Sequence, residues 1–167
     1  PGPACETSYR QAIEEYARAG LSPTCFFGGA ERCPDGLFAR FADYRARRDV
    51  PAGYVPCTSL WLVDGDEFLA EVSIRHRLTP ALERFGGHIG YAVRAGRWGQ
   101  GLGTKLLAGA LDYARGTLGL SWVLLTCADD NTGSARVIEK NGGVLLDKLD
   151  DVIDGRPRVT RRYRIAL

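Results

Sequence analysis

The stretch RWGQGLGTKLL, from Arg97 to Leu107, places three glycines at alternate positions directly before an apolar run with helical spacing. Glycine inside regular structure costs about 0.5–1 kcal/mol relative to alanine, so Gly99, Gly101 and Gly103 require an explanation. A strand that enters a helix through a glycine-rich turn is typical of an anion site, because the first N–H groups of a helix lack partners. The alternative is a tight turn with close packing of helix against strand. Three glycines within five residues favour the anion site.

Two common phosphate-binding loops do not fit this stretch. A Walker A loop needs GxxxxGK[ST], but the order here is Gly103-Thr104-Lys105, so the lysine is displaced. A dinucleotide-binding loop needs GxGxxG, and Leu106 stands where the third glycine is required. These mismatches disfavour a nucleotide-phosphate enzyme, and the remaining candidate is the pyrophosphate loop of acyl-CoA transferases.

The segments on either side of the loop predict alternating helices and strands. The run WVLLTC is continuously apolar, as expected for a strand covered on both faces. Asp64-Gly65-Asp66 separates two strand-like runs and predicts a hairpin, and Asp35 is a candidate cap for the second helix. By these signals we expect loops at 21–34 and 51–56, helices at 6–19, 35–49, 78–85, 103–118 and 132–141, and strands at 59–63, 67–75, 88–94, 122–127, 144–149 and 158–165.

The composition is that of a soluble globular protein. With 167 residues, 45% of them hydrophobic and 25% charged, the chain predicts a single domain over 1–167. No apolar run approaches the roughly 18–20 residues of a membrane span, and no secretory signal is visible, so we expect no membrane partner. A net charge of +2 argues against a nucleic-acid partner, because that binding needs a dense basic face.

The cysteines favour a reducing compartment. They are odd in number and form no CxxC pair, whereas disulfide frameworks and zinc sites prefer tighter, paired spacing. We therefore expect reduced thiols, a cytoplasmic location and no bound metal. The five residues are Cys5, Cys25, Cys33, Cys57 and Cys127.

Two longer motifs resemble those of one known family. The segment IGYAVRAGRWGQGLG, Ile89 to Gly103, looks like the central motif of the GNAT superfamily of acetyl-CoA-dependent N-acyltransferases. The segment CADDNTGSARVIEKNGG, Cys127 to Gly143, resembles the motif that follows it, and WLVDGDEFLAEVSIRH and GGHIGY resemble a bacterial subgroup of predicted acetyltransferases. The resemblance covers about Ser59 to the end. It implies an α+β, three-layer fold: a mixed, mostly antiparallel central sheet flanked by helices, with splayed central strands.

The resemblance also implies a cofactor and a set of residues that bind it. Backbone amides from Gln100 to Thr104 would hold the pyrophosphate of acetyl-CoA, and pantetheine would lie between the splayed strands. Trp98 stands where the family pattern usually has Arg or Gln, and some branches carry Trp there. The implied cofactor-binding residues are Val93, Trp98, Gly99, Gln100, Gly101, Leu102, Gly103, Thr104, Lys105, Asn131 and Ser134.

The implied reaction is direct attack of an amine on the thioester in a ternary complex. Attack needs a neutral amine, and an alkyl amine has a pKa near 10, so a base is expected. The candidates are His88, His76 and Glu71, and a backbone N–H near Val93 would stabilise the oxyanion. Many family members carry a tyrosine acid at the place of Ile138. Tyr91, Tyr163, Cys127 or water could replace it, or the thiolate could leave unassisted.

Several alternatives stay open. The missing tyrosine allows a non-catalytic acyl-CoA sensor, and the acceptor could be a small molecule or a peptide amine. Homodimers are frequent in such folds. The run of Asp147, Asp150, Asp151 and Asp154 could attract a cationic amine or be a solvated hairpin tip. The first strand of the family has no clear counterpart and is expected in residues before Pro1.

Overall fold

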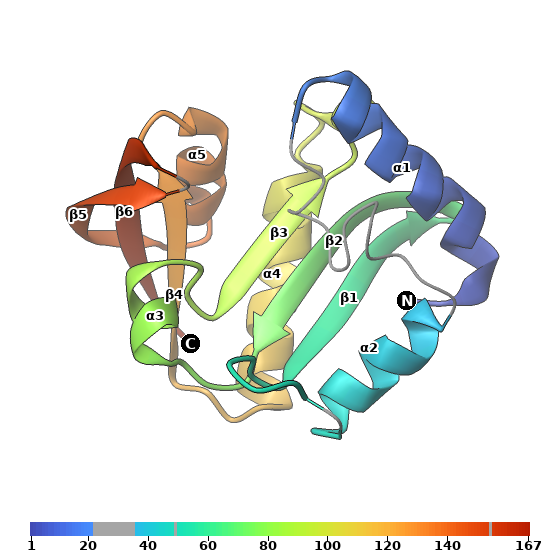
Figure 1. Cartoon of the computed structure of the whole chain (residues 1–167), viewed down its shortest axis with the longest axis horizontal. Coiled ribbons are helices and arrows are strands. Elements are labelled where there is room, and N and C mark those ends of the chain that lie inside the picture. The colour runs from blue at the N-terminus through green and yellow to red at the C-terminus, as the bar shows by residue number, and fades with distance from the viewer. Residues whose placement is uncertain (22–35, 49, 154) are drawn as a thin grey trace.

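The computed structural model describes residues 1–21, 36–48, 50–153 and 155–167. Six strands form one sheet in the order β1-β2-β3-β4-β6-β5 (Figure 1), and every neighbouring pair is antiparallel except β3 with β4. The strands are β1 (Cys57–Asp64), β2 (Glu67–Arg75), β3 (Ile89–Val93), β4 (Trp122–Ala128), β5 (Val144–Ile153) and β6 (Arg156–Ala166). The helices are α1 (Glu6–Arg18), α2 (Leu37–Arg45), α3 (Pro80–Arg84), α4 (Leu102–Gly116) and α5 (Thr132–Lys140). The predicted fold class is confirmed.

Helices cover both faces of the sheet (Figure 1). The apolar stripe of α4 packs with α5 against one face, in a core that includes Val72, Leu107 and Leu125. On the other face α1 and α2 pack over β1 and β2, in a second core around Tyr9 and Phe68. Because side chains alternate along a strand, successive residues of β2 and β3 enter different cores.

Element positions agree with the sequence, and most differences are at their ends. The helix expected at 35–49 ends at Arg45, and the Asp35 cap lies outside the described residues. The last hairpin is longer than expected at 144–149 and 158–165, and within it Asp147 of β5 pairs with Arg162 of β6. Asp154 and the loop expected at 21–34, apart from Leu21, lie outside the described residues. The described part has no strand before Cys57.

The two central strands meet at their starts and then diverge (Figure 1). Within the described residues Ile89 and Leu125 are the only pair in register, and His88 N donates to Leu124 O at 2.7 Å just before it. The chain approaches β4 most closely at Gly87, where a Cβ would lie 2.2 Å from Leu124 O. The predicted splay is therefore present, and the opening lies at the C-terminal ends of β3 and β4.

Candidate active site

Glycine is required at Gly99, Gly101 and Gly103, around the start of α4, for two different reasons. Gly99 and Gly101 adopt φ of 78° and 77°, in the left-handed region that favours glycine. Gly103 is buried under its neighbours: a Cβ there would lie 3.3 Å from Val137 Cγ2 and 3.5 Å from Val93 Cγ2. The tight turn and the close packing considered for this stretch are therefore both present. Neither conflicts with an anion site, because the same turn leaves the helix end open.

The N-terminus of α4 has no protein cap. Gly101 is its N-cap and offers no side chain, and the first bond back to the loop comes from Lys105 N to Gly101 O at 3.2 Å. Within the described residues the N–H groups of 102–104 have no hydrogen-bond partner. Three aligned donors at the positive end of a fifteen-residue helix are suited to an anion such as a diphosphate.

The edge of β3 offers donors to the crevice between β3 and β4. Arg75 N donates to His88 O and Arg94 N to Leu69 O, so the even-numbered residues of this segment face β2. By the alternation of an antiparallel ladder, the backbone groups of Tyr91 and Val93 point away from β2 into the crevice. An extended chain could pair with this edge as an additional strand.

The Val93 carbonyl is already held by two side chains. Tyr16 Oη donates to it at 2.6 Å and Trp98 Nε1 at 2.8 Å, and the two rings meet edge to face. Trp98 is 54% exposed, so part of its side chain lies at the surface, while the indole N–H holds the carbonyl at the end of β3. This geometry gives Trp98 a positioning role where an Arg or Gln side chain would reach outward. The Val93 N–H remains as the donor to the crevice.

A pair of hydroxyls joins β3 to α5. Tyr91 Oη and Ser134 Oγ are 2.9 Å apart, and burial raises the pKa of Tyr91 to about 12, so its hydroxyl keeps the proton at neutral pH. Asn131 Oδ1 accepts from Ser134 N at 2.9 Å and so caps α5. The structure thus brings together Tyr91, Asn131 and Ser134, and gives Asn131 a structural role that the sequence did not indicate.

The structure also places the other acid candidates. Tyr163 is 1% exposed and donates to Glu139 Oε1 at 3.0 Å, so its hydroxyl is engaged away from the crevice edge of β3. Cys127 is a buried free thiol whose pKa is raised by burial. Ile138 is fully buried in the core.

Among the three candidate bases, Glu71 lies beside the part of β3 that faces the opening. It is paired in register with Ala92, between the two β3 residues that face the opening. Its side chain is on the α1 and α2 face, is 2% exposed, and accepts a hydrogen bond from Trp61 Nε1 at 3.0 Å. This contact orients one carboxylate oxygen.

Both histidines lie at the opposite end of β3. His88 Nδ1 accepts from Leu124 N at 3.0 Å, so that lone pair is used, and the neutral ring then carries its proton on Nε2. Burial, and then the charge of Arg75, lower the His88 pKa. His76 Nε2 is 2.9 Å from Thr58 Oγ1, and burial, followed by the charge of Arg47, lowers its pKa. The geometry gives both rings structural partners and does not bring them to the open end of the crevice.

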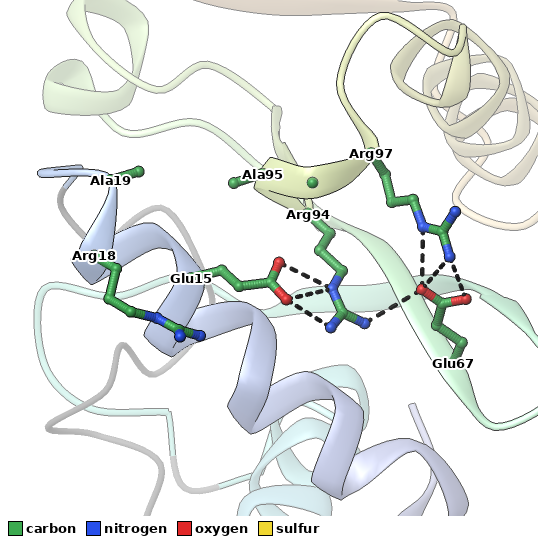
Figure 2. Close-up of a pocket in the computed structure, with 8 residues that line it drawn as sticks. Glu15, Arg18, Ala19, Glu67, Arg94, Ala95 and Arg97 are labelled. Atoms are coloured by element: carbon green, nitrogen blue, oxygen red, sulfur yellow. Dashed lines mark hydrogen bonds and ion pairs between the residues drawn. The ribbon is translucent and has the colours of Figure 1, made fainter.

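An ion network joins α1 to the start of the glycine loop (Figure 2). Arg94 lies between Glu15 and Glu67, and Arg97 takes the other side of Glu67; the shortest contacts to Glu15 and Glu67 are both 2.7 Å. These residues line an open pocket of about 640 Å³. Hydrogen bonding to Arg94 lowers the pKa of Glu15 and raises that of Arg94. The network fixes the direction in which the chain leaves β3.

Replacing Arg94 by glutamine should lower the free energy of unfolding by about 2 kcal/mol at pH 7, because charged hydrogen bonds to a half-buried carboxylate are lost. The Glu15 pKa is depressed in the folded state. Its contribution is therefore present above the ordinary carboxyl pKa of about 4.3, and is lost as pH falls through the lowered value. Urea unfolding at pH 7 and about pH 3 should show the deficit shrinking in acid.

The matched control is Arg48→Gln, which removes the exposed pair with Asp43 and should change stability by less than about 0.5 kcal/mol. A deficit of the Arg94 variant that is as large in acid as at neutral pH would contradict the ionic explanation.

Comparison with known proteins decides the family. A family model described as an acetyltransferase (GNAT) domain matches residues 15–144. The chain belongs to the GNAT acetyltransferase family. No curated protein matches the sequence.

Solved structures show the same GNAT fold at low identity. A ribosomal-protein alanine acetyltransferase from Vibrio fischeri superposes with a TM-score of 0.71 at 16% identity, covering 98% of this chain and 87% of that one. A putative acetyltransferase from Salmonella typhimurium with its cofactor acetyl-CoA gives 0.64 at 18% identity, covering 99% and 90%. A ribosomal alpha-N-protein acetyltransferase in complex with coenzyme A gives 0.67 at 18%, covering 96% and 88%.

Sequence reasoning missed part of the supporting structure in this GNAT domain. Tyr16, from the first helix, reaches Val93 across 77 positions, and Glu15 meets Arg94 across 79. Their only signal in the sequence was helical spacing around Tyr16, which predicted burial and no partner. Within the described residues no helix is long and apolar enough to cross a membrane.

Proposed function

We propose that this GNAT domain transfers an acetyl group from acetyl-CoA to a primary amine, by direct attack of the amine in a ternary complex. The observation that carries the proposal is the glycine-led N-terminus of α4, uncapped within the described residues, beside a crevice into which the β3 edge directs the N–H groups of Tyr91 and Val93. Such an arrangement suits a ligand with a diphosphate at one end and an extended amide chain at the other.

Different residues of the site would contact successive parts of such a ligand. The N–H groups of 102–104 would hold the diphosphate, and the β3 edge at Tyr91 and Val93 would pair with pantetheine. Lys105 and Gln100 are exposed at the same loop and could add contacts to the phosphates. The cofactor supplies an activated acyl group as a thioester. The Val93 N–H is the hydrogen-bond donor to the negative charge that develops on the acyl oxygen. The hydrogen bonds from Tyr16 and Trp98 to the Val93 carbonyl hold this part of the backbone in place.

Proton transfer is assigned to groups on the two faces of the sheet. Glu71, which is 2% exposed, takes the proton from the amine through a chain of water molecules as the nitrogen–carbon bond forms, and the Tyr91–Ser134 hydroxyl pair gives a proton to the departing sulfur as the carbon–sulfur bond breaks. Because the pKa of Tyr91 is about 12, its hydroxyl is protonated at neutral pH and can donate a proton. His88 and His76 are not required in this scheme.

A non-catalytic acyl-CoA sensor remains the second candidate. The observation in its favour is that Ile138, at the position of the family's tyrosine acid, is fully buried and cannot donate a proton. The Tyr91–Ser134 pair argues for the enzyme, since it places a neutral acid at the crevice from another direction. Release of coenzyme A on mixing protein, acetyl-CoA and an amine panel distinguishes the two.

The diphosphate site is tested by Thr104→Glu, in the first turn of α4. A carboxylate there should favour the helix by about 0.3–1 kcal/mol, yet weaken coenzyme A binding at least about tenfold, because it repels the diphosphate. Thr104→Gln is the control of matched shape and should bind within about threefold of the original. Calorimetric titration measures both, and equal affinity of the two variants would contradict the assignment.

A further inference from the structure

The feature that the proposed reaction leaves unused is Arg75, the last residue of β2. It lies on the same face of the strand as Glu71 and Ser73, the face that carries α1 and α2. Its Nη1 donates to Gly86 O at 2.9 Å and to Gly87 O at 3.1 Å. A Cβ on Gly90 would lie 3.7 Å from Nη1 and 3.8 Å from Nη2. The guanidinium therefore lies over Gly90 of β3, beside the central strands.

Arg75 has neither an acidic nor an aromatic partner within the described residues. Arg94, Arg97, Arg161 and Arg162 each meet a carboxylate at 2.5–2.7 Å, and Arg164 lies over the Trp122 ring. Within the described residues no carboxylate pairs with Arg75, and only its Nη1 has acceptors, both of them carbonyls. Burial lowers its pKa, which is the mark of a cation held partly out of water without a counter-ion.

Arg75 is partly exposed. Its Nε and Nη2 have no hydrogen-bond partner in the described part of the chain. A half-buried guanidinium with one edge fixed by carbonyls and the other open has the geometry that receives a carboxylate. Because residue 90 is glycine, no side chain of β3 occupies the position next to the Arg75 guanidinium.

We infer that Arg75 binds a carboxylate of the acceptor amine, so that the acceptor is an amino carboxylate whose amine reaches Glu71. The inference rests on the proposed function. Along β2 the Cα atoms of Glu71 and Arg75 are four residues apart, roughly 13 Å, and the guanidinium reaches back over Gly90, the partner of Ser73. An amine at Glu71 and a carboxylate at Arg75 are then separated by roughly 7–10 Å. That distance excludes an α-amine with its own carboxylate and selects an ω-amine.

The test is a series of ω-amino carboxylates used as a ruler, each compared with its own carboxamide. The series is glycine, 4-aminobutyrate, 6-aminohexanoate and 8-aminooctanoate, with kcat/KM measured by release of the coenzyme A thiol. In the unmodified protein we expect the six- and eight-carbon acids to be the best, and each to exceed its carboxamide at least about tenfold. This comparison needs no variant, so it holds even if substitutions at Arg75 disturb the fold.

Substitutions at Arg75 then test whether the preference for the acid over the carboxamide depends on this side chain. Arg75→Gln should bring the acid-to-carboxamide ratio close to one, chiefly by raising KM for the acid, whereas Arg75→Lys should retain part of it. Arg77→Gln, two residues further on and exposed, is the matched control and should keep the full ratio. Far-UV circular dichroism and calorimetric binding of acetyl-CoA establish that each variant is folded and holds the donor.

The outcomes separate the two levels of the proposal. No binding of acetyl-CoA would overturn the proposed function itself. With acetyl-CoA bound, equal turnover of acids and carboxamides, or no turnover of the acids, would overturn the role of Arg75. A preference for succinyl-CoA over acetyl-CoA that disappears in Arg75→Gln would place the carboxylate on the donor, and would also overturn the assignment to the acceptor.

Discussion

Replacing Glu71 by glutamine should lower kcat for acetyl transfer by about 10²–10³-fold, while the affinity for acetyl-CoA stays unchanged. The amide keeps the size of the side chain and an oxygen that can accept from Trp61 Nε1, but it cannot take a proton from the amine. The binding edge at Tyr91 and Val93 and the N-terminus of α4 are untouched. The loss should therefore be in kcat, as steady-state kinetics at saturating acetyl-CoA will show.

The pH profile makes this test specific to a base. An amine that is already neutral needs the base least, so the loss in the Glu71→Gln variant should be largest near neutral pH, and should shrink as pH rises towards the amine pKa of about 10. Glu83→Gln, on the exposed helix α3, is the control and should change neither the rate nor the profile. A Glu71→Gln variant that matched the rate of the unmodified protein at every pH would return the histidines to consideration.

Replacing Gly87 by alanine should destabilise the domain by more than about 4 kcal/mol, enough to unfold much of it at 25 °C. Two costs add together. The residue has φ of +57°, which strains any L side chain, and its Cβ would lie 2.2 Å from Leu124 O and 2.7 Å from Leu124 C. The obstacle is backbone of β4, so no side chain can move aside. Thermal unfolding followed by circular dichroism measures the loss.

Gly65→Ala separates these two costs. Gly65 has φ of +58°, almost the same as Gly87, but nothing lies within 4 Å of its Cβ position. The alanine there should cost only the conformational strain, about 1 kcal/mol. If the two variants lost the same stability, the close approach of β3 to β4 would not be the reason for glycine at position 87.

The sequence predicted the class of the fold well because each element carries a local signal. The run WVLLTC predicted the buried strand β4, and its three central residues, Val123, Leu124 and Leu125, are indeed buried. The spacing after Gly103 predicted α4, and the structure starts that helix at Leu102. These signals depend on neighbours in the chain, which the sequence displays directly.

Other features of the site depend on residues far apart in the chain. Periodicity predicted an apolar helix face that includes Tyr16, but not that the Tyr16 hydroxyl meets the Val93 carbonyl. Sequence reasoning placed His88 beside the central strands. The structure shows that its Nδ1 accepts a hydrogen bond from Leu124 N. Partners of this kind follow from how strands and helices are stacked, which no window of sequence contains.

The sequence alone determined that a glycine turn opens a helix after a strand, because backbone freedom and helix ends are local properties of the residues concerned. Only the tertiary structure decided that the chain meets β4 at Gly87 and Ile89, that β3 and β4 separate beyond this point, and that Glu71 is paired with the separating part of β3. The physical reason is that the chemistry of a side chain depends on the residue type alone. The distance between two groups depends on how all the elements between them pack.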